Sequence, residues 1–153
     1  MTSKLYFLVM LVVFSNCSSK EGHSKMSSKD IASASERVTA LSAEIKAPSQ
    51  FVDAEFDLFN VNGFSNSRNM VPGASHWDYR FVIKTDSSNV DSWLHGLDKV
   101  DSADISWTID VIDHRKHLWN ITGSPEIYKS NDQMTSAVVY RSEGIVFKIY
   151  RGR

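Results

Sequence analysis

The 153-residue sequence contains a single cysteine, Cys17, so no disulfide can form within one chain. Its longest apolar run, residues 5–14, has about half the length that a membrane-spanning helix needs. Neither sign of charge dominates, because the net charge is only −1. A near-neutral chain has no broad basic field for nucleic acid, so we expect no nucleic-acid partner.

The sequence also lacks the short motifs of common enzyme classes. It has no G-x-S-x-G nucleophile elbow and no glycine-rich phosphate loop. We therefore expect no enzyme activity and no cofactor. The weakest of our three functional hypotheses is a hydrolase with an unrecognised site, for which His76 near Asp78 supplies an acid–base candidate.

What the sequence does contain begins with a leader. Lys4 precedes the apolar run, and Ser15-Asn16-Cys17 follows it directly, which is typical of a secretory signal peptide. The stretch Phe14-Ser15-Asn16-Cys17 resembles the lipobox of bacterial lipoproteins. This resemblance implies export, removal of residues 1–16, and acylation of Cys17, for example with palmitate, so that the lipid bilayer becomes a partner. In such proteins Ser18, in place of an aspartate, favours the outer membrane facing the periplasm of the cell envelope.

The remaining chain predicts a tether and one domain. Residues 17–29 combine the lipidated cysteine with a serine- and lysine-rich stretch that has little to bury, so we expect a flexible tether. Residues 30–153 then predict a single α+β domain. The spacing of Ile31, Ala34, Val38, Leu41 and Ile45 predicts an amphipathic helix over residues 30–46.

The domain pattern is rich in strands. Period-two alternation predicts strands over residues 52–58, 77–84 and 105–111, a short strand over 117–122, and a hairpin over 135–151 with Gly144 in its turn. If the first two strands pair antiparallel, Arg80 and Lys84 can face the acidic residues of 53–57. Val90, Trp93, Leu94 and Leu97 predict a second helix that ends near Lys99. We expect an antiparallel sheet of five or six strands with two helices packed on one face, and residues 127–128 in a loop or short edge.

Two groups of residues are candidates for a site. A possible binding surface is provided by the long segment 64–76 together with two aromatic residues elsewhere, since interfaces favour Trp and Tyr. Its members are Phe64, Arg68, Met70, His76, Trp119 and Tyr128. His114 and His117 form an H-x-x-H pair, a weak zinc candidate, but no second pair has ligand spacing, so we expect no metal.

Two further hypotheses follow from the predicted export to the cell envelope and from the small size of the domain. The first is a membrane-anchored envelope lipoprotein that binds a protein partner, as an inhibitor, an immunity factor or an assembly accessory. The alternative is a lipoprotein that binds a small ligand or the cell wall through aromatic side chains, which make up 11% of the chain.

Overall fold

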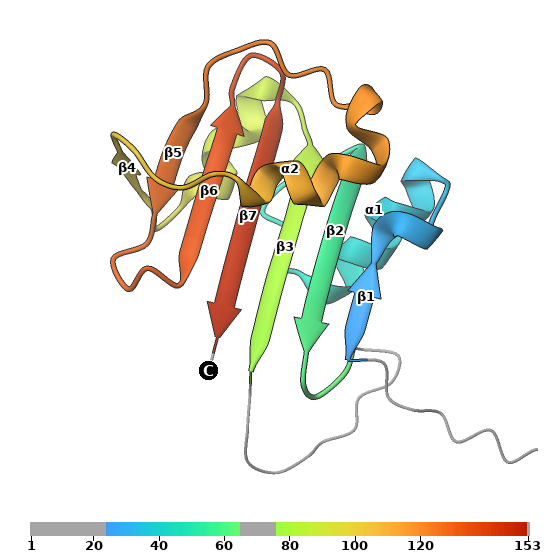
Figure 1. The fold of residues 1–153 in the computed structure, drawn as a ribbon. Coiled ribbons are helices and arrows are strands. Elements are labelled where there is room, and N and C mark those ends of the chain that lie inside the picture. Colours follow the sequence, from blue (N-terminus) through green and yellow to red (C-terminus); the bar gives the residue numbers. More distant parts are fainter. Residues whose placement is uncertain (1–23, 65–75, 153) are drawn as a thin grey trace, which may run out of the picture.

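The structure is a computed structural model that describes residues 24–64 and 76–152. Within those residues, Figure 1 shows one antiparallel sheet of seven strands. In order across the sheet, the strands are β1 (Lys25–Ser27), β2 (Asp53–Asn60), β3 (Trp77–Lys84), β7 (Ile145–Gly152), β6 (Thr135–Tyr140), β5 (Glu126–Lys129) and β4 (Asp98–Val100). The expected α+β class with an antiparallel sheet is confirmed, with more strands than the five or six expected.

Helical segments lie on both faces of this sheet (Figure 1). In the two described ranges these segments are α1 (Ala34–Glu44), α2 (Trp107–Ile112) and three 3₁₀ segments, η1 (Ser28–Asp30), η2 (Ser87–Leu94) and η3 (Asp113–Leu118). We call the side that packs α1 and η2 the α1 face, and the opposite side the α2 face. The prediction that the helices pack on one face is therefore wrong, because a segment predicted as a strand forms α2 and covers the second face.

Residues 105–111 explain this difference. Their alternation of apolar and polar residues predicts a strand, but the structure forms α2 over Trp107–Ile112. The buried positions are Thr108, Val111 and Ile112, at helical spacing, while Ile109 is 53% exposed. So short an apolar run fits both the strand period of 2 and the helical period of 3.6. The helix forms because its buried residues pack against the open face of the sheet.

Three other boundaries differ from the sequence prediction. The second predicted helix is the 3₁₀ segment η2, which ends at Leu94, before Gly96 with its φ of 76°. The strand predicted over residues 117–122 is wrong, because residues 117 and 118 belong to η3 and residues 119–122 form no strand. The backbone amides of Thr122 and Gly123 donate instead to the Glu143 carboxylate at 3.1 and 2.7 Å. Residues 127 and 128, expected in a loop or short edge, lie within β5, which pairs with β4 on one side and β6 on the other.

The strongest sequence signals are confirmed. Residues 135–140 and 145–152 form the β6–β7 hairpin, and Gly144 has the expected left-handed φ of 64°. Strands β2 and β3 pair antiparallel in the register that sets Asp57 opposite Arg80 and Asp53 opposite Lys84. The glycine turn predicts the hairpin, and the alternation of apolar and polar residues predicts the faces of β2 and β3, because both signals lie within short stretches of sequence.

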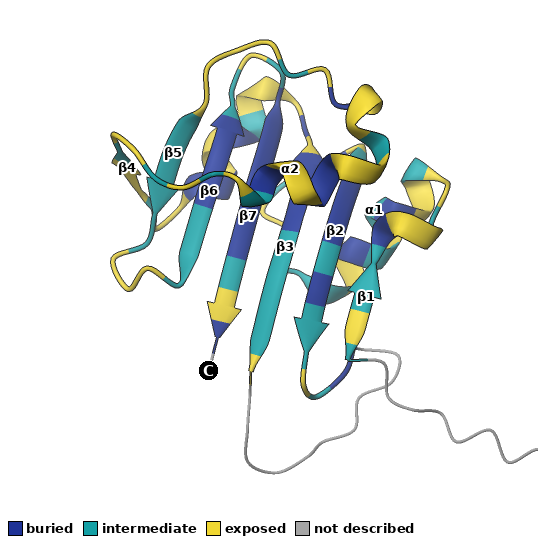
Figure 2. Cartoon of the chain, in the orientation of Figure 1, coloured by how far each residue is buried: buried dark blue, intermediate teal, exposed yellow. Residues whose placement is uncertain are grey.

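Two hydrophobic cores follow from the two covered faces, and Figure 2 shows the buried residues concentrated along the middle strands. On the α1 face, Leu41 of α1 and Trp93 of η2 pack against Phe56 and Phe81 of the sheet. On the α2 face, Val111 and Ile112 pack with Val82 and Phe147. Every central strand therefore buries both sides, at least over part of its length.

The chain joins the fold earlier than the tether prediction expected. Residues 25–27 form β1 beside β2, and Ser28 is only 2% exposed. The Ser28 hydroxyl donates to Glu55 Oε2 at 2.6 Å and accepts from the Phe56 amide at 2.9 Å. Residues 25–29 thus belong to the domain. Within the two described ranges, no helix has the length and apolar character that crossing a bilayer would require.

One buried lysine gives the domain a predictable response to pH. Lys148 of β7 is 5% exposed, its Nζ donates to the Trp93 carbonyl at 2.6 Å, and it lies 4.8 Å from the centre of the Tyr150 ring. Burial lowers the pKa of Lys148 to about 8 from its usual 10.5. Between these values the unfolded chain binds more protons than the folded one, so the free energy of unfolding rises as pH rises.

We expect the Lys148→Met variant to lose this response. From pH 7 to 9.5, the free energy of unfolding of the wild type should rise by about 1–2 kcal/mol relative to the variant. Urea unfolding at a series of pH values measures this difference, and the range stops below the titration of Tyr150, whose pKa is raised by burial. Parallel pH profiles for the two proteins would contradict the assignment to Lys148.

Candidate functional site

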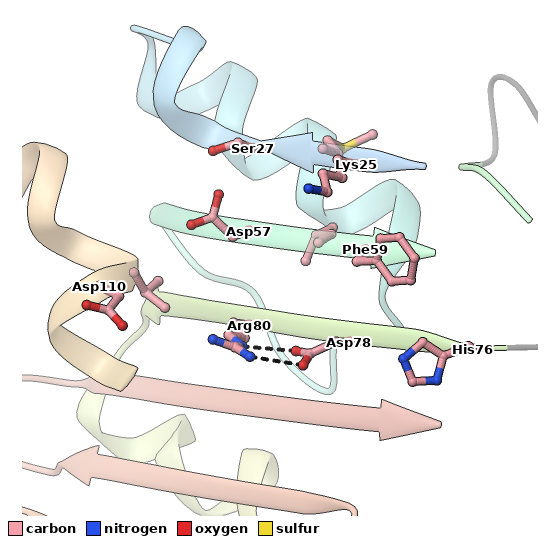
Figure 3. A pocket seen from close by; sticks show the side chains of 11 residues that line it. Lys25, Ser27, Asp57, Phe59, His76, Asp78, Arg80 and Asp110 are labelled. Atoms are coloured by element: carbon pink, nitrogen blue, oxygen red, sulfur yellow. Dashed lines mark hydrogen bonds and ion pairs between the residues drawn. The ribbon is translucent and has the colours of Figure 1, made fainter. Parts of the chain in front are cut away.

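The α2 face is only partly covered, and a groove of about 520 Å³ lies beside α2, over one end of β1, β2 and β3. Figure 3 shows the side chains around it. We call it the charged groove, and its lining is Lys25, Met26, Ser27, Asp57, Leu58, Phe59, His76, Asp78, Arg80, Asp110 and Val111.

The charged groove is built by strand alternation. Side chains two residues apart on a strand point to the same face, so Asp78 and Arg80 share a face with Val82, which lies in the core beneath α2. Asp57 is the register partner of Arg80 and also of Ser27. The same face is therefore apolar under α2 and charged beyond it, and Asp110 projects from α2 itself (Figure 3).

Arg80 is held in place by its own strand. Its Nε and Nη2 donate to the two carboxylate oxygens of Asp78 at 3.0 and 3.1 Å, a bidentate pair. Arg151 of β7 adds a contact to Asp78 at 3.5 Å. The hydrogen bonds that Arg80 donates to Asp78 raise the pKa of Arg80, and the charges of Asp110 and Asp57 act in the same direction. Arg80 is thus a fixed, fully charged group whose close partner is Asp78.

The other two carboxylates of the groove are differently placed. Among the described residues, Asp57 and Asp110 make no close ion pair, and they act on Arg80 only at longer range. With three carboxylates against Lys25 and Arg80, the lining carries a formal charge of −1 with His76 neutral. A basic side chain entering the groove would find two carboxylates, Asp57 and Asp110, that no residue of 24–64 or 76–152 neutralises at contact distance.

One end of the groove is aromatic. The rings of Phe59 and His76 lie 5.9 Å apart at an angle of 60°. Both stand at the end of the strand pair, since Phe59 is near the end of β2 and His76 directly precedes β3. Protein interfaces are enriched in aromatic side chains, so this end is a candidate contact for a protein segment.

The structure separates the residues predicted as one binding surface. Only His76 lines the groove. Phe64 is 2% exposed in the α1-face core and Trp119 is 5% exposed in the α2-face core, so neither offers a surface. Tyr128 lies on β5, where its hydroxyl donates to Glu126 at 2.7 Å. Cys17, Arg68 and Met70 lie outside the described residues.

The structure also places the H-x-x-H pair, His114 and His117, which was the weak zinc candidate. His114 and His117 both lie in η3 and are exposed. In the described part of the chain, no three side chains of His, Cys, Asp or Glu come together in a way that could hold a metal ion.

Sequence reasoning missed most of the groove. It identified Asp57 and Arg80 as cross-strand neighbours, but it gave them a pairing role and placed no cavity beside them. Asp110 was assigned to a strand, so its approach to β3 from α2 had no signal in the sequence.

The class of protein is thus an α+β domain with one antiparallel sheet, helical cover on both faces and an open charged groove. No family model, no curated protein and no solved structure matches this chain. Its function must therefore be argued from the site itself.

Proposed function

We propose that this protein is an envelope lipoprotein that binds a protein partner through the charged groove. The observation that carries the proposal is the pair of carboxylates, Asp57 and Asp110, that face the groove without a close ion-pair partner among the described residues. Together with the Phe59–His76 end, they fit a partner segment that presents a basic side chain next to an apolar one.

The leader adds a location to this proposal. If Cys17 is acylated, Lys25 at the edge of the groove follows it by eight residues, which is at most about 28 Å of extended chain. The groove would then lie close to the membrane surface. The partner we expect is accordingly an envelope protein that is itself exposed near that surface.

Charge reversal in the groove tests the proposal. The full-length protein is crosslinked in native envelope membranes, and the proteins recovered with it are quantified by mass spectrometry. We expect one dominant partner, whose recovery falls about tenfold in the Asp57→Lys/Asp110→Lys variant, because like charges would then oppose the basic segment.

The matched control is Asp101→Lys, an exposed carboxylate that lies between β4 and α2, outside the groove lining. This variant makes a single charge reversal away from the groove and should recover the partner at the wild-type level. Circular dichroism establishes that all variants are folded. Equal recovery by the wild type and the double variant would overturn the proposal.

A further inference from the structure

A second hollow lies on the α1 face, on the other side of the sheet from the charged groove. It has a volume of about 420 Å³, and we call it the aromatic pocket. Its lining is Glu44, Ile45, Lys46, Asn60, Trp77, Tyr79 and Tyr150. This volume is at the small end of the range for small-ligand sites.

The strand register brings the three rings together. Trp77 and Tyr79 are two residues apart on β3, so both project to the α1 face, and Tyr150 of β7 is the register partner of Tyr79. Residues 44–46, at the end of α1, form the opposite wall. All three rings are half-buried, so part of each remains outside the core.

Packing fixes the rings before any ligand arrives. The Trp77 and Tyr79 rings lie 5.7 Å apart at 62°, and the Tyr150 ring lies 5.8 Å from the buried Phe81. Asn60 Nδ2 donates to the Tyr79 hydroxyl at 3.0 Å. The Trp77 ring rests against Gly152, where a Cβ atom would lie only 2.1 Å from the ring. The absence of a side chain at position 152 is thus what gives the indole its place.

The charges around the rings select the kind of ligand. Glu44 and Lys46 cancel, so the lining has no net charge to attract an ion. A quaternary ammonium ligand needs free aromatic faces, but the Lys148 ammonium already lies over the Tyr150 ring at 4.8 Å. A neutral ligand is favoured over either kind of ion.

The rings and the polar groups together favour a sugar. A pyranose ring has an apolar face that can stack on an indole or a phenol, and a rim of hydroxyls that bonds to amide, carboxylate and ammonium groups. Asn60, Glu44 and Lys46 bring one of each to the lining. The Asn60 amide already donates to the Tyr79 hydroxyl and accepts from the Asn62 amide, so it would give a sugar its second N–H and its second oxygen lone pair. We propose that the aromatic pocket binds a neutral oligosaccharide, with one ring stacked on Trp77. This inference does not rest on the charged groove, and it holds if the groove binds nothing.

The test uses full-length protein in a detergent that has no sugar headgroup. N-acetylglucosamine tetrasaccharide and cellotetraose are titrated separately by calorimetry, and the indole N–H resonance of Trp77 is followed by NMR. We expect saturable binding of at least one saccharide together with a shift of that resonance. The Trp77→Leu variant keeps an apolar side chain but removes the ring, and it should weaken binding about tenfold, which is at the low end of the range for nucleic-acid bases stacked on aromatic side chains.

The matched control is Trp107→Leu, which removes a half-buried indole from the α2 face. Binding should be unchanged in this variant. The resonance of Trp77 in the wild type locates the site even if Trp77→Leu fails to fold. The proposal is overturned if neither saccharide binds at about 10 mM, ten times a weak Kd of about 1 mM. It is equally overturned if tetramethylammonium binds while both saccharides do not, or if a bound saccharide leaves the Trp77 resonance unmoved.

Discussion

The Glu55→Gln variant should be less stable than the wild type by about 3 kcal/mol, which is a large share of the stability of a small domain. Glu55 is 1% exposed and lies between two arginines. Arg115 Nη1 donates to its two carboxylate oxygens at 3.1 and 2.9 Å, and Arg37 Nε lies 3.5 Å from Oε1. Removing this negative charge leaves the nearly buried guanidinium of Arg115 without a carboxylate partner within residues 24–64 and 76–152, whereas Arg37 keeps Asp53, whose Oδ1 lies 2.6 Å from Arg37 Nη2.

The network around Glu55 explains why one residue matters so much. Arg37 belongs to α1 on one face, and Arg115 belongs to η3 on the other side of the sheet edge (Figure 1). Arg115 Nη2 also donates to the Ile31 carbonyl at 2.8 Å, and Arg37 Nη1 donates to the Ala32 carbonyl at 2.7 Å. The charged pairs therefore join the N-terminal segment, α1, β2 and η3 at one corner.

Urea unfolding compares Glu55→Gln with Asp57→Asn, which makes the same chemical change two residues along β2 at a half-exposed position. We expect Asp57→Asn to change the free energy of unfolding by less than about 0.5 kcal/mol, as exposed substitutions do. A loss in Glu55→Gln no larger than that of its control would mean that the network contributes little to stability.

The second large effect is expected at the turn of the β6–β7 hairpin, where Gly144→Ala should destabilise the domain by about 3 kcal/mol or more. Gly144 has a φ of 64°, and a Cβ atom there would lie 2.0 Å from the Thr85 carbonyl oxygen. The Thr85 amide also donates to the Gly144 carbonyl at 2.9 Å, so the turn is fastened to the segment that leads into η2. An alanine must break this contact as well as adopt a left-handed backbone.

Gly96→Ala separates the two causes. Gly96 has a φ of 76°, and a Cβ atom there would meet nothing within 4 Å. This variant carries the backbone strain alone, about 1–2 kcal/mol for an L-residue. If urea unfolding gives the same loss for both glycine variants, then the turn moves away from Thr85 at little cost, contrary to the prediction.

The sequence predicted single residues of the two candidate sites, but it did not predict the pockets that those residues line. His76 was recognised from its place at the end of a long segment, and Trp77 and Tyr79 were recognised as a strand pattern. Neither signal indicates a pocket, because each pocket needs a wall from another part of the chain. For the charged groove that wall comes from α2 and β1, and for the aromatic pocket it comes from the end of α1 and from β7.

The sequence by itself determined the class of fold, the antiparallel pairing of β2 with β3, helix α1, and the β6–β7 hairpin with its left-handed glycine. In each of these the information lies within one or two adjacent segments, as alternation, helical spacing or turn chemistry. Tertiary structure decided the rest. Residues 107–112 form a helix because in this form they bury apolar side chains against the α2 face of the sheet. Ser28 and Arg115 bind the buried carboxylate of Glu55, although they lie 27 and 60 residues from it in the sequence. Such contacts produce no periodic pattern in the sequence, because they become favourable only when distant segments come together and bury the charged group away from water.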